Sequence, residues 1–371
     1  MSRRFLVVFG TRPEAIKMAP VVRTLRSRPD CEVTVAVTAQ HREMLDQVLE
    51  LFEIVPDHDL DIMEHGQSLT QITCRVLEGI GGILDRERFD AVVVHGDTTT
   101  TFATALAAFY HQVPVAHVEA GMRTGDIMCP FPEEANRSLT ARLVRWHFAP
   151  SVTCEENLLR EGIDPDRVFR TPRNTVVDAL LHVRDVPYEF PGGPVACALF
   201  SGRRIVLVTA HRRESWGRGM EAIFSAVARL AEAHPDIHVL LATHANPVVA
   251  DAADRILASR ERVDIIGPQD YLPFVKLLDA AHLILSDSGG IQEEGPALGT
   301  PVVVLRDVTE YPELLGRGVV VLAGTDEDGI FEAVSRLLRD EGALARMRQA
   351  CEETRTQDAS SAIAEVLCGG S

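Results

Sequence analysis

Residues 4–17 read RFLVVFGTRPEAIK, an apolar run that meets a glycine and then a more polar stretch. The β-branched and aromatic residues of the run predict a buried strand. Pro13 is favoured in the first turn of a helix, because its fixed φ suits that turn and its missing N–H is not needed there. The segment therefore predicts a strand, a turn at Gly10 and a helix, which is the repeating unit of a parallel α/β sheet.

The same alternation of short apolar runs and longer amphipathic stretches continues along the chain. We expect strands at Arg4–Phe9, Glu32–Thr38, Ala91–His95, Pro114–Val118, Trp146–Ala149, Ile205–Thr209, His238–Ala242, Val263–Ile266, Leu283–Leu285 and Val302–Leu305. We expect helices at Glu14–Ser27, Glu43–Leu51, Leu69–Asp85, Thr99–His111, Glu133–Leu143, Gly219–His234, Ala250–Ser259, Leu272–Ala281, Gln292–Leu298 and Gly329–Leu338. Because crossover helices join parallel strands, the pattern predicts an α/β fold.

The pattern occurs twice. A new first strand at Ile205–Thr209 follows the Pro- and Gly-rich stretch 187–202, so the boundary between two domains falls within 170–204. We assign residues 1–172 to the N-terminal domain and 173–371 to the C-terminal domain. The sequence leaves open whether the last helix packs back on the first domain. The predicted architecture is two Rossmann-like, doubly wound domains facing a cleft.

Composition limits the partners. The chain has 371 residues and a net charge of −17, which disfavours nucleic acid or an anionic membrane as partner. Its seven cysteines lack CxxC spacing, so they indicate neither a zinc site nor a disulfide framework. No apolar run reaches about 18 residues, and the first residues do not form a signal peptide pattern. We expect a cytoplasmic protein without a metal.

Two strand-to-helix turns carry features of phosphate binding. Arg12 and Lys17 flank the start of the first helix, whose dipole favours anions, although a solvated arginine and a surface lysine are equally compatible with the spacing. Ser288, Gly289 and Gly290 open a later helix, where phosphate oxygens can approach backbone N–H groups without a Cβ in the way. The alternative there is a tight turn with a capping serine. Neither turn has the spacing of a dinucleotide fingerprint or a Walker loop.

Acidic residues follow two strands of the first half. Asp97 and Glu119 come at strand ends, and Glu133 and Glu134 open a helix after a Pro-rich entry. Each acid alone also suits a helix cap or a helix dipole. Together they indicate general acid/base chemistry.

A histidine stands among basic residues at the end of the first strand of the second half. His211 precedes Arg212 and Arg213, and it is a candidate base or phosphate ligand. A single histidine at a strand end is more often structural.

Six motifs in order resemble the non-hydrolysing UDP-N-acetylglucosamine 2-epimerase family across nearly the whole chain. They are Gly10-Thr11-Arg12-Pro13-Glu14, His95-Gly96-Asp97-Thr98-Thr99, His117-Val118-Glu119-Ala120-Gly121, Pro130-Phe131-Pro132-Glu133-Glu134, His211-Arg212-Arg213-Glu214 and Ser288-Gly289-Gly290-Ile291-Gln292-Glu293-Glu294. The resemblance implies a GT-B-like fold with the nucleotide sugar between the domains, a homodimer, and a role in polysaccharide or amino-sugar biosynthesis. It also implies reversible conversion of UDP-GlcNAc to UDP-ManNAc without a cofactor.

The resemblance also assigns residues. Catalytic roles fall on Asp97, Glu119, Glu133 and His211. Contacts to the UDP-sugar fall on Arg12, Lys17, Arg212, Gln269, Phe274, Ser288, Gly289, Gly290, Glu294 and the position of Tyr311. A regulatory site for a second UDP-GlcNAc falls near Gln40, Glu43, Glu134 and His244, with Glu43 standing where some members have Gln.

The chemistry agrees with the family mechanism. No carbonyl acidifies the proton on C2 of the sugar, and the fingerprint of an NAD-dependent route is absent. Loss of UDP from C1 together with the C2 proton, followed by re-addition, needs carboxylates near C2 and cations on the diphosphate. The chain offers both.

Departures from the family pattern keep alternatives open. Tyr311 stands where most members have Arg, Ala210 and Arg173 where Gly is usual, and Thr243 where Pro is usual. Ile127-Met128-Cys129 is an unusual lead into the Pro130 motif. The alternatives are a 2-epimerase of a modified UDP-sugar such as a diacetamido uronic acid, a hydrolysing 2-epimerase, a UDP-sugar glycosyltransferase, and a catalytically silent binding subunit.

Overall fold

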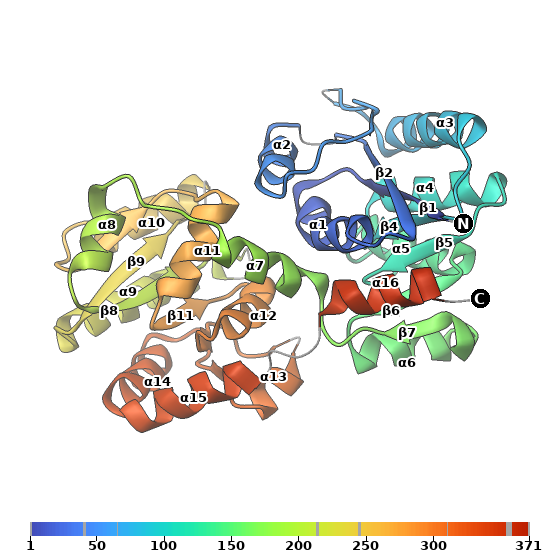
Figure 1. Ribbon diagram of the computed structural model, residues 1–371. Helices are drawn as coiled ribbons and strands as arrows, with labels where there is room; N and C mark the ends of the chain where they lie inside the picture. Colours follow the sequence, from blue (N-terminus) through green and yellow to red (C-terminus); the bar gives the residue numbers. More distant parts are fainter. Residues whose placement is uncertain are drawn as a thin grey trace. The chain divides into compact units, whose positions relative to one another are not determined.

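The computed structural model describes residues 2–39, 42–64, 66–212, 215–243, 246–309, 311–353 and 358–369 (Figure 1). The chain divides into two compact units. Unit 1 comprises Met1–Ala179 with Thr356–Ser371, and unit 2 comprises Leu180–Arg355. The division falls within helix α7 (Thr175–Asp185), later in the chain than the 172/173 boundary expected from the sequence.

Unit 1 holds a seven-stranded parallel sheet in the order β3-β2-β1-β4-β5-β6-β7. Its strands are β1 (Arg3–Phe9), β2 (Cys31–Val37), β3 (His58–Asp59), β4 (Ala91–His95), β5 (Val115–Val118), β6 (Trp146–Ala149) and β7 (Val168–Arg170). Its helices are α1 (Arg12–Arg26), α2 (Arg42–Leu51), α3 (Leu69–Arg86), α4 (Thr99–Tyr110), α5 (Glu133–Leu143), α6 (Val152–Arg160), the 3₁₀ turn η1 (Pro165–Arg167), the start of α7, and α16 (Ala359–Gly369).

Unit 2 holds a six-stranded parallel sheet in the order β10-β9-β8-β11-β12-β13. Its strands are β8 (Arg204–Thr209), β9 (Ile237–Ala242), β10 (Val263–Ile266), β11 (Leu283–Ser286), β12 (Val302–Val304) and β13 (Val320–Leu322). Its helices are the rest of α7, α8 (Gly193–Phe200), α9 (Arg218–Ala233), α10 (Pro247–Leu257), α11 (Tyr271–Ala280), α12 (Gly289–Leu298), α13 (Pro312–Gly316), α14 (Glu327–Arg339) and α15 (Glu341–Glu353). The predicted fold class, two parallel-sheet α/β domains, is confirmed.

Each sheet is buried by its own helices. In unit 1, Leu6 and Val92 pack in one apolar cluster with Ile80 of α3 and Ala105 of α4. In unit 2, the central strands β8 and β11 share a cluster with helices α9 and α14. Strands covered on both faces need apolar residues at nearly every position, which is why the central strands are continuous apolar runs in the sequence.

The opening segment folds as a strand, a turn and a helix, with one shift. Helix α1 begins at Arg12, two residues before the predicted Glu14, because Thr11 is its N-cap. Thr11 and Glu14 form a capping box, in which each side chain meets the other residue's backbone N–H. Glu14 is therefore turned inward and is only 2% exposed.

The last described helix returns to unit 1. Helix α16 packs against α1 (Figure 1). The Arg3 guanidinium donates to the carbonyl of Leu367. Cys31 in β2 and Cys368 in α16 are paired as a disulfide with Cα atoms 7.1 Å apart, beyond the roughly 4.4–6.8 Å that disulfides usually span. The scattered cysteines had predicted no such pair, since its members are 337 residues apart. None of the helices in the described part of the chain has both the length and the hydropathy of a membrane span.

Candidate functional site

Two acidic residues of unit 1 follow neighbouring strands. Asp97 comes after β4 and Glu119 directly after β5, and these strands pair in parallel. Parallel strands end at one edge of a sheet, so both carboxyl groups lie at the edge where α/β proteins bind ligands. The structure therefore brings these two predicted residues together, and the charge of Glu119 acts on the Asp97 carboxyl.

Glu119 is held as a carboxylate. Its Oε2 accepts from Lys17 Nζ at 2.5 Å and from Asn174 Nδ2 at 2.6 Å, and His95 Nε2 lies 3.5 Å away. Burial alone would raise the pKa of Glu119, but the charges of Lys17 and His95 and the hydrogen bonds they make hold it well below the usual range. Glu119 also has a φ of +63°, a conformation that non-glycine residues seldom adopt and that is common at functional sites.

The pKa of Asp97 is shifted in the opposite direction, upward. Burial raises its pKa, and the nearby charges of Glu119 and Glu133 raise it further. Arg137, whose Nη1 lies 3.5 Å from Asp97 Oδ2, opposes the rise only in part. Neighbouring carboxyl groups whose pKa values are pushed apart are suited to separate acid and base roles.

The turn that carries Asp97 is fixed by a buried histidine. Gly96 has a φ of +65°, and its carbonyl accepts from His117 Nε2 at 2.7 Å. A carbonyl cannot donate, so this bond assigns the His117 proton to Nε2. Burial lowers the pKa of His117 to about 4 and that of His147, its neighbour in the β5–β6 register, to about 3. Asn136 Nδ2 donates to the Asp97 carbonyl at 3.0 Å and holds the same turn from α5.

Of the predicted regulatory residues, only Glu134 has a described side chain. Buried Glu134 accepts from the backbone N–H groups of Thr124 and Gly125 at 3.1 and 3.2 Å, and Arg137 Nε lies 2.9 Å from it. Gln40 and His244 lie outside the described residues, as do the side chain of Glu43 and the motif residues Arg213 and Glu214. Glu133, the first residue of α5, is half-buried near Asp97.

In unit 2, the turns after the adjacent strands β8 and β11 meet at Asp287. This fully buried carboxylate accepts the backbone N–H groups of His211 and Arg212, each at 2.9 Å, and His211 Nδ1 lies 3.7 Å from it. The chain order does not show which turn Asp287 reaches, so the sequence does not predict this contact.

The paired glycines lie at the start of a helix, as the sequence predicts. Helix α12 begins at Gly289, three residues earlier than the predicted Gln292. Ser288 is its N-cap and makes no side-chain capping bond. The first N–H groups of a helix lack partners within the helix, and together with the dipole they favour an anion.

The other predicted contacts of unit 2 are spread over separate elements. Phe274 lies in α11 and Glu294 in α12, whereas Gln269 precedes α11 and donates to the Gly267 carbonyl at 2.8 Å. Tyr311 precedes α13, and its backbone N–H donates to Thr309 Oγ1 at 3.0 Å. The Thr309 hydroxyl in turn donates to Gln292.

Two departures from the family pattern have a structural explanation. Ala210 is only 1% exposed and packs in the core of unit 2, so its methyl group fits where Gly is usual. Arg173 pairs with Asp178, with Nη2 and Oδ1 2.7 Å apart.

Residues that the sequence did not single out complete the acid pair. His95 and Asn174 contact Glu119, and Arg137 contacts Asp97. His95 was visible as a strand-end residue beside Asp97. Asn174 gave no signal, because it lies 55 residues from the carboxylate it contacts.

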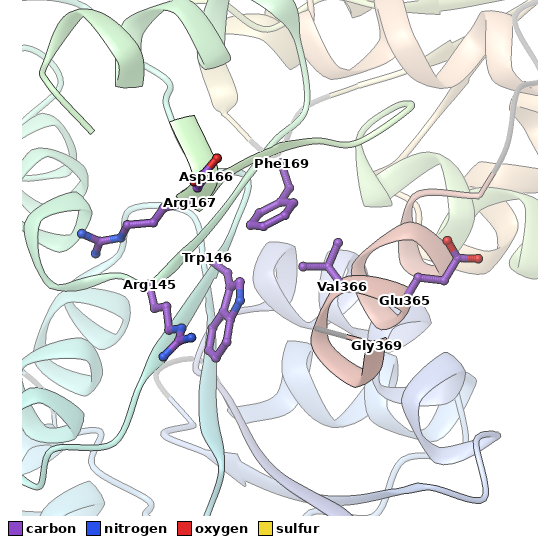
Figure 2. Close-up of a pocket in the computed structure, with 8 residues that line it drawn as sticks. All are labelled: Arg145, Trp146, Asp166, Arg167, Phe169, Glu365, Val366 and Gly369. Atoms are coloured by element: carbon purple, nitrogen blue, oxygen red, sulfur yellow. The ribbon is translucent and has the colours of Figure 1, made fainter. Parts of the chain in front are cut away.

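A separate cavity of about 890 Å³ lies beside the first residues of β6 and β7 (Figure 2). These strand starts are at the opposite edge of the sheet from Asp97 and Glu119, which follow strand ends. The residues that line the cavity are Arg145, Trp146, Asp166, Arg167, Phe169, Glu365, Val366 and Gly369. The Arg145 guanidinium stacks on the Trp146 ring, 4.9 Å from its centroid. The cavity therefore has no part in the acid/base site.

Comparison with known proteins first gives the class. A glycotransferase of kitacinnamycin, 14% identical, has a TM-score of 0.62 over 99% of this chain and 98% of its own, which shows a shared GT-B-like fold alone. Residues 23–368 match the family described as UDP-N-acetylglucosamine 2-epimerase. The chain belongs to this family.

Individual relatives agree. The UDP-N-acetylglucosamine 2-epimerase of Yersinia pestis is 54% identical over 352 residues, 94% of this chain and 93% of its own length. That of Escherichia coli (strain K12) is 53% identical over 98% of both chains. The crystal structure of the Neisseria meningitidis UDP-GlcNAc 2-epimerase bound to UDP-GlcNAc is 43% identical, with a TM-score of 0.80 over 99% of this chain and 100% of that one.

Proposed function

We propose that this chain interconverts UDP-GlcNAc and UDP-ManNAc without hydrolysing them. The observation that carries the proposal is the pair of neighbouring carboxyl groups with opposite pKa shifts, Asp97 raised and Glu119 lowered. Inversion at C2 requires one group that accepts a proton and one that donates a proton, and such a pair supplies both. Membership of the epimerase family supports the same activity.

The reaction divides into an elimination and an addition. The Glu119 carboxylate accepts the C2 proton, and the electron pair of the broken C2–H bond forms a C1=C2 double bond. The C1–O bond breaks, and its electron pair leaves with UDP. The products of this half are a 2-acetamidoglucal and UDP. Asp97 then donates a proton to C2 on the opposite face, where the electron pair of the double bond forms the new C2–H bond, and a diphosphate oxygen of UDP forms the C1–O bond again. Glu119 releases its proton to solvent and Asp97 regains one, which resets the pair. Neither half of the reaction changes the summed oxidation state of the sugar and UDP, so no redox cofactor is required.

Other residues stabilise charge. Lys17 and Asn174 hold Glu119 in place, and Glu133 beside Asp97 favours the protonated form of that carboxyl. In unit 2 we assign the departing diphosphate to the N-terminus of α12 at Ser288–Gly290, with His211 and Arg212 as further donors. Arg12, at the start of α1, has the same role in unit 1, and Gln269, Phe274 and Glu294 are assigned to the nucleoside.

The finer features of the family are also proposals. A homodimer rests on the family resemblance. A second UDP-GlcNAc as activator rests on the family resemblance alone. Tyr311, in place of the family's Arg, favours one second candidate, a 2-epimerase acting on a modified UDP-sugar.

Proton NMR of the purified protein with UDP-GlcNAc in D₂O, without NAD or metal, tests the activity. We expect a new anomeric signal and deuterium at C2. Asp97→Asn should lower turnover by at least about 100-fold while UDP still binds, because proton transfer typically contributes 10²–10⁴-fold. Asp166→Asn, which changes an exposed carboxylate of η1, is the matched control.

Full turnover by Asp97→Asn would remove that residue from the mechanism. Unchanged UDP-GlcNAc, with UDP binding shown separately, would transfer the proposal to a modified sugar.

A further inference from the structure

We propose that Glu14 is a positioning residue, which ties the turn after β1 to the turn after β4 and so holds Asp97 where proton transfer at C2 takes place. The inference rests on the proposed function. Neither the sequence nor the family comparison assigns Glu14 any role beyond its place in a motif.

One carboxylate oxygen of Glu14 holds the turn after β1. Oε2 accepts from Gly10 N at 3.1 Å, from Thr11 N at 2.9 Å and from Thr11 Oγ1 at 2.8 Å. This side of the contact includes the capping box of α1. It fixes the start of the helix that carries Lys17, the partner of Glu119.

The other oxygen holds the turn after β4. Oε1 accepts from Thr98 Oγ1 at 2.7 Å, and Thr101 Oγ1 lies 3.2 Å away and 2.5 Å from the His95 carbonyl. Thr98 directly follows Asp97 and is the N-cap of α4, with its hydroxyl accepting from Thr101 N at 3.2 Å. A shift of the Thr98 side chain would therefore move Asp97 as well.

The arrangement exceeds what a helix cap requires. A buried carboxylate is costly unless it is hydrogen-bonded, and capping box geometry alone asks for one backbone N–H on the acid. Glu14 instead spans two strands that lie side by side in the sheet. A separate contact joins the buried hydroxyls of Thr38, which follows β2, and Thr100, in the first turn of α4; they lie 3.0 Å apart and do not touch Glu14.

These two contacts supply matched variants. Thr98→Val removes the hydroxyl that Glu14 holds, Thr98→Ser keeps it, and Thr100→Val removes a buried hydroxyl from the next turn without touching Glu14. We expect Thr98→Val to lower kcat by about 10- to 100-fold with little change in KM, since a misplacement of about 1 Å can cost that much. Thr98→Ser should stay within about threefold of the wild type, and Thr100→Val should lower the melting temperature but not kcat. Equal losses of kcat in Thr98→Val and Thr100→Val, or none in Thr98→Val, would overturn the inference.

A second readout does not depend on the reaction. Carboxyl ¹³C NMR of the full chain follows the titration of Asp97, and we expect its midpoint to change in Thr98→Val and to be restored in Thr98→Ser. A wild type that leaves UDP-GlcNAc unchanged would count against the proposed function, and the titration would then decide about Glu14 by itself. An unchanged Asp97 titration in Thr98→Val would overturn the inference whatever the activity.

Discussion

The two units join the turns of their central strands in related ways. In unit 1 the turns after β1 and β4 meet at Glu14, and in unit 2 the turns after β8 and β11 meet at Asp287. Both carboxylates are almost completely buried. In each sheet, the two strands concerned are paired in parallel.

The difference lies in the donors. Glu14 stands after the first strand of its pair and reaches threonine hydroxyls on the far turn, whereas Asp287 stands after the second and reaches backbone N–H groups. A hydroxyl can be removed by mutation and a backbone N–H cannot. The link in unit 1 can therefore be adjusted one side chain at a time, while the link in unit 2 depends on one carboxylate.

Asp287→Ala should have the largest effect on stability. It leaves the N–H groups of His211 and Arg212 without their acceptor, and we expect unit 2 to lose about 3 kcal/mol of unfolding free energy. Urea unfolding followed by hydrogen exchange in peptides of each unit measures the loss. Asp287→Asn, which keeps one oxygen acceptor, should lose about half as much. If Asp287→Ala lowers the unfolding free energy of unit 2 no more than Thr98→Val lowers that of unit 1, then backbone donors and hydroxyl donors stabilise the two turns equally.

The residues just before these links differ too, Gly10 in unit 1 and Ala210 in unit 2. A Cβ at Gly10 would lie 2.0 Å from Thr38 Oγ1 and 2.8 Å from Thr100 Oγ1, so Gly10→Ala should cost about 2 kcal/mol through overpacking. Ala210→Gly should cost about 1 kcal/mol, since it removes one buried methyl group and frees the unfolded backbone.

Thermal unfolding of both variants is the measurement, with Gly10→Ala in a Thr38→Ala background as the control. That background removes the nearest atom and should recover part of the loss. Equal costs at the two positions would show that the units are packed alike at these turns.

Just below neutral pH, the smallest of these effects concerns protonation and falls on unit 1. Because burial lowers the pKa of His117 to about 4, below about 6.5 for an unfolded histidine, the unfolded chain binds more protons between these values. Stability due to this residue is present above pH 6.5, falls by about 1.4 kcal/mol per pH unit as the pH drops, and is lost below about 4. Burial raises the pKa of Asp178 to about 6, and the stability due to that residue changes with pH in the opposite direction. The contribution of His117 is therefore measured as the difference in stability between the wild type and a His117 variant at each pH.

His117→Gln keeps a donor for the Gly96 carbonyl but cannot titrate. Its stability, from urea unfolding at several pH values, should depend less on pH than that of the wild type. Parallel curves for the two proteins would mean that His117 does not remain neutral in the fold.

The central strands could be predicted because each is buried on both faces and is therefore an unbroken apolar run. Strands β3, β7 and β13 have two or three residues each, which is too few for a pattern. Helix α8 was missed because its Gly–Pro start suggests a linker, and α6, α7, α13 and α15 were not predicted either. A last helix was expected without bounds, and it is α16.

The acids of the candidate site could be named because they follow strands directly. Their partners could not, since parallel pairing decides which turns become neighbours. Asn174 contacts Glu119, 55 positions away in the sequence, and Glu14 contacts Thr98, 84 positions away. The roles of Asp97 and Glu119 as acid and base remain predictions.

The return of α16 to unit 1 also sets an order of events during synthesis. Helix α1 leaves the ribosome early, but the helix that packs against it follows every strand of unit 2. Asp178 likewise accepts hydrogen bonds from Ser360 N at 2.8 Å and Ser360 Oγ at 2.7 Å, which form only after residue 360 has been synthesised. Translation thus completes unit 2 before unit 1 has its last helix. A nascent chain halted before residue 359 exposes to chaperones the apolar side of α1 that α16 covers.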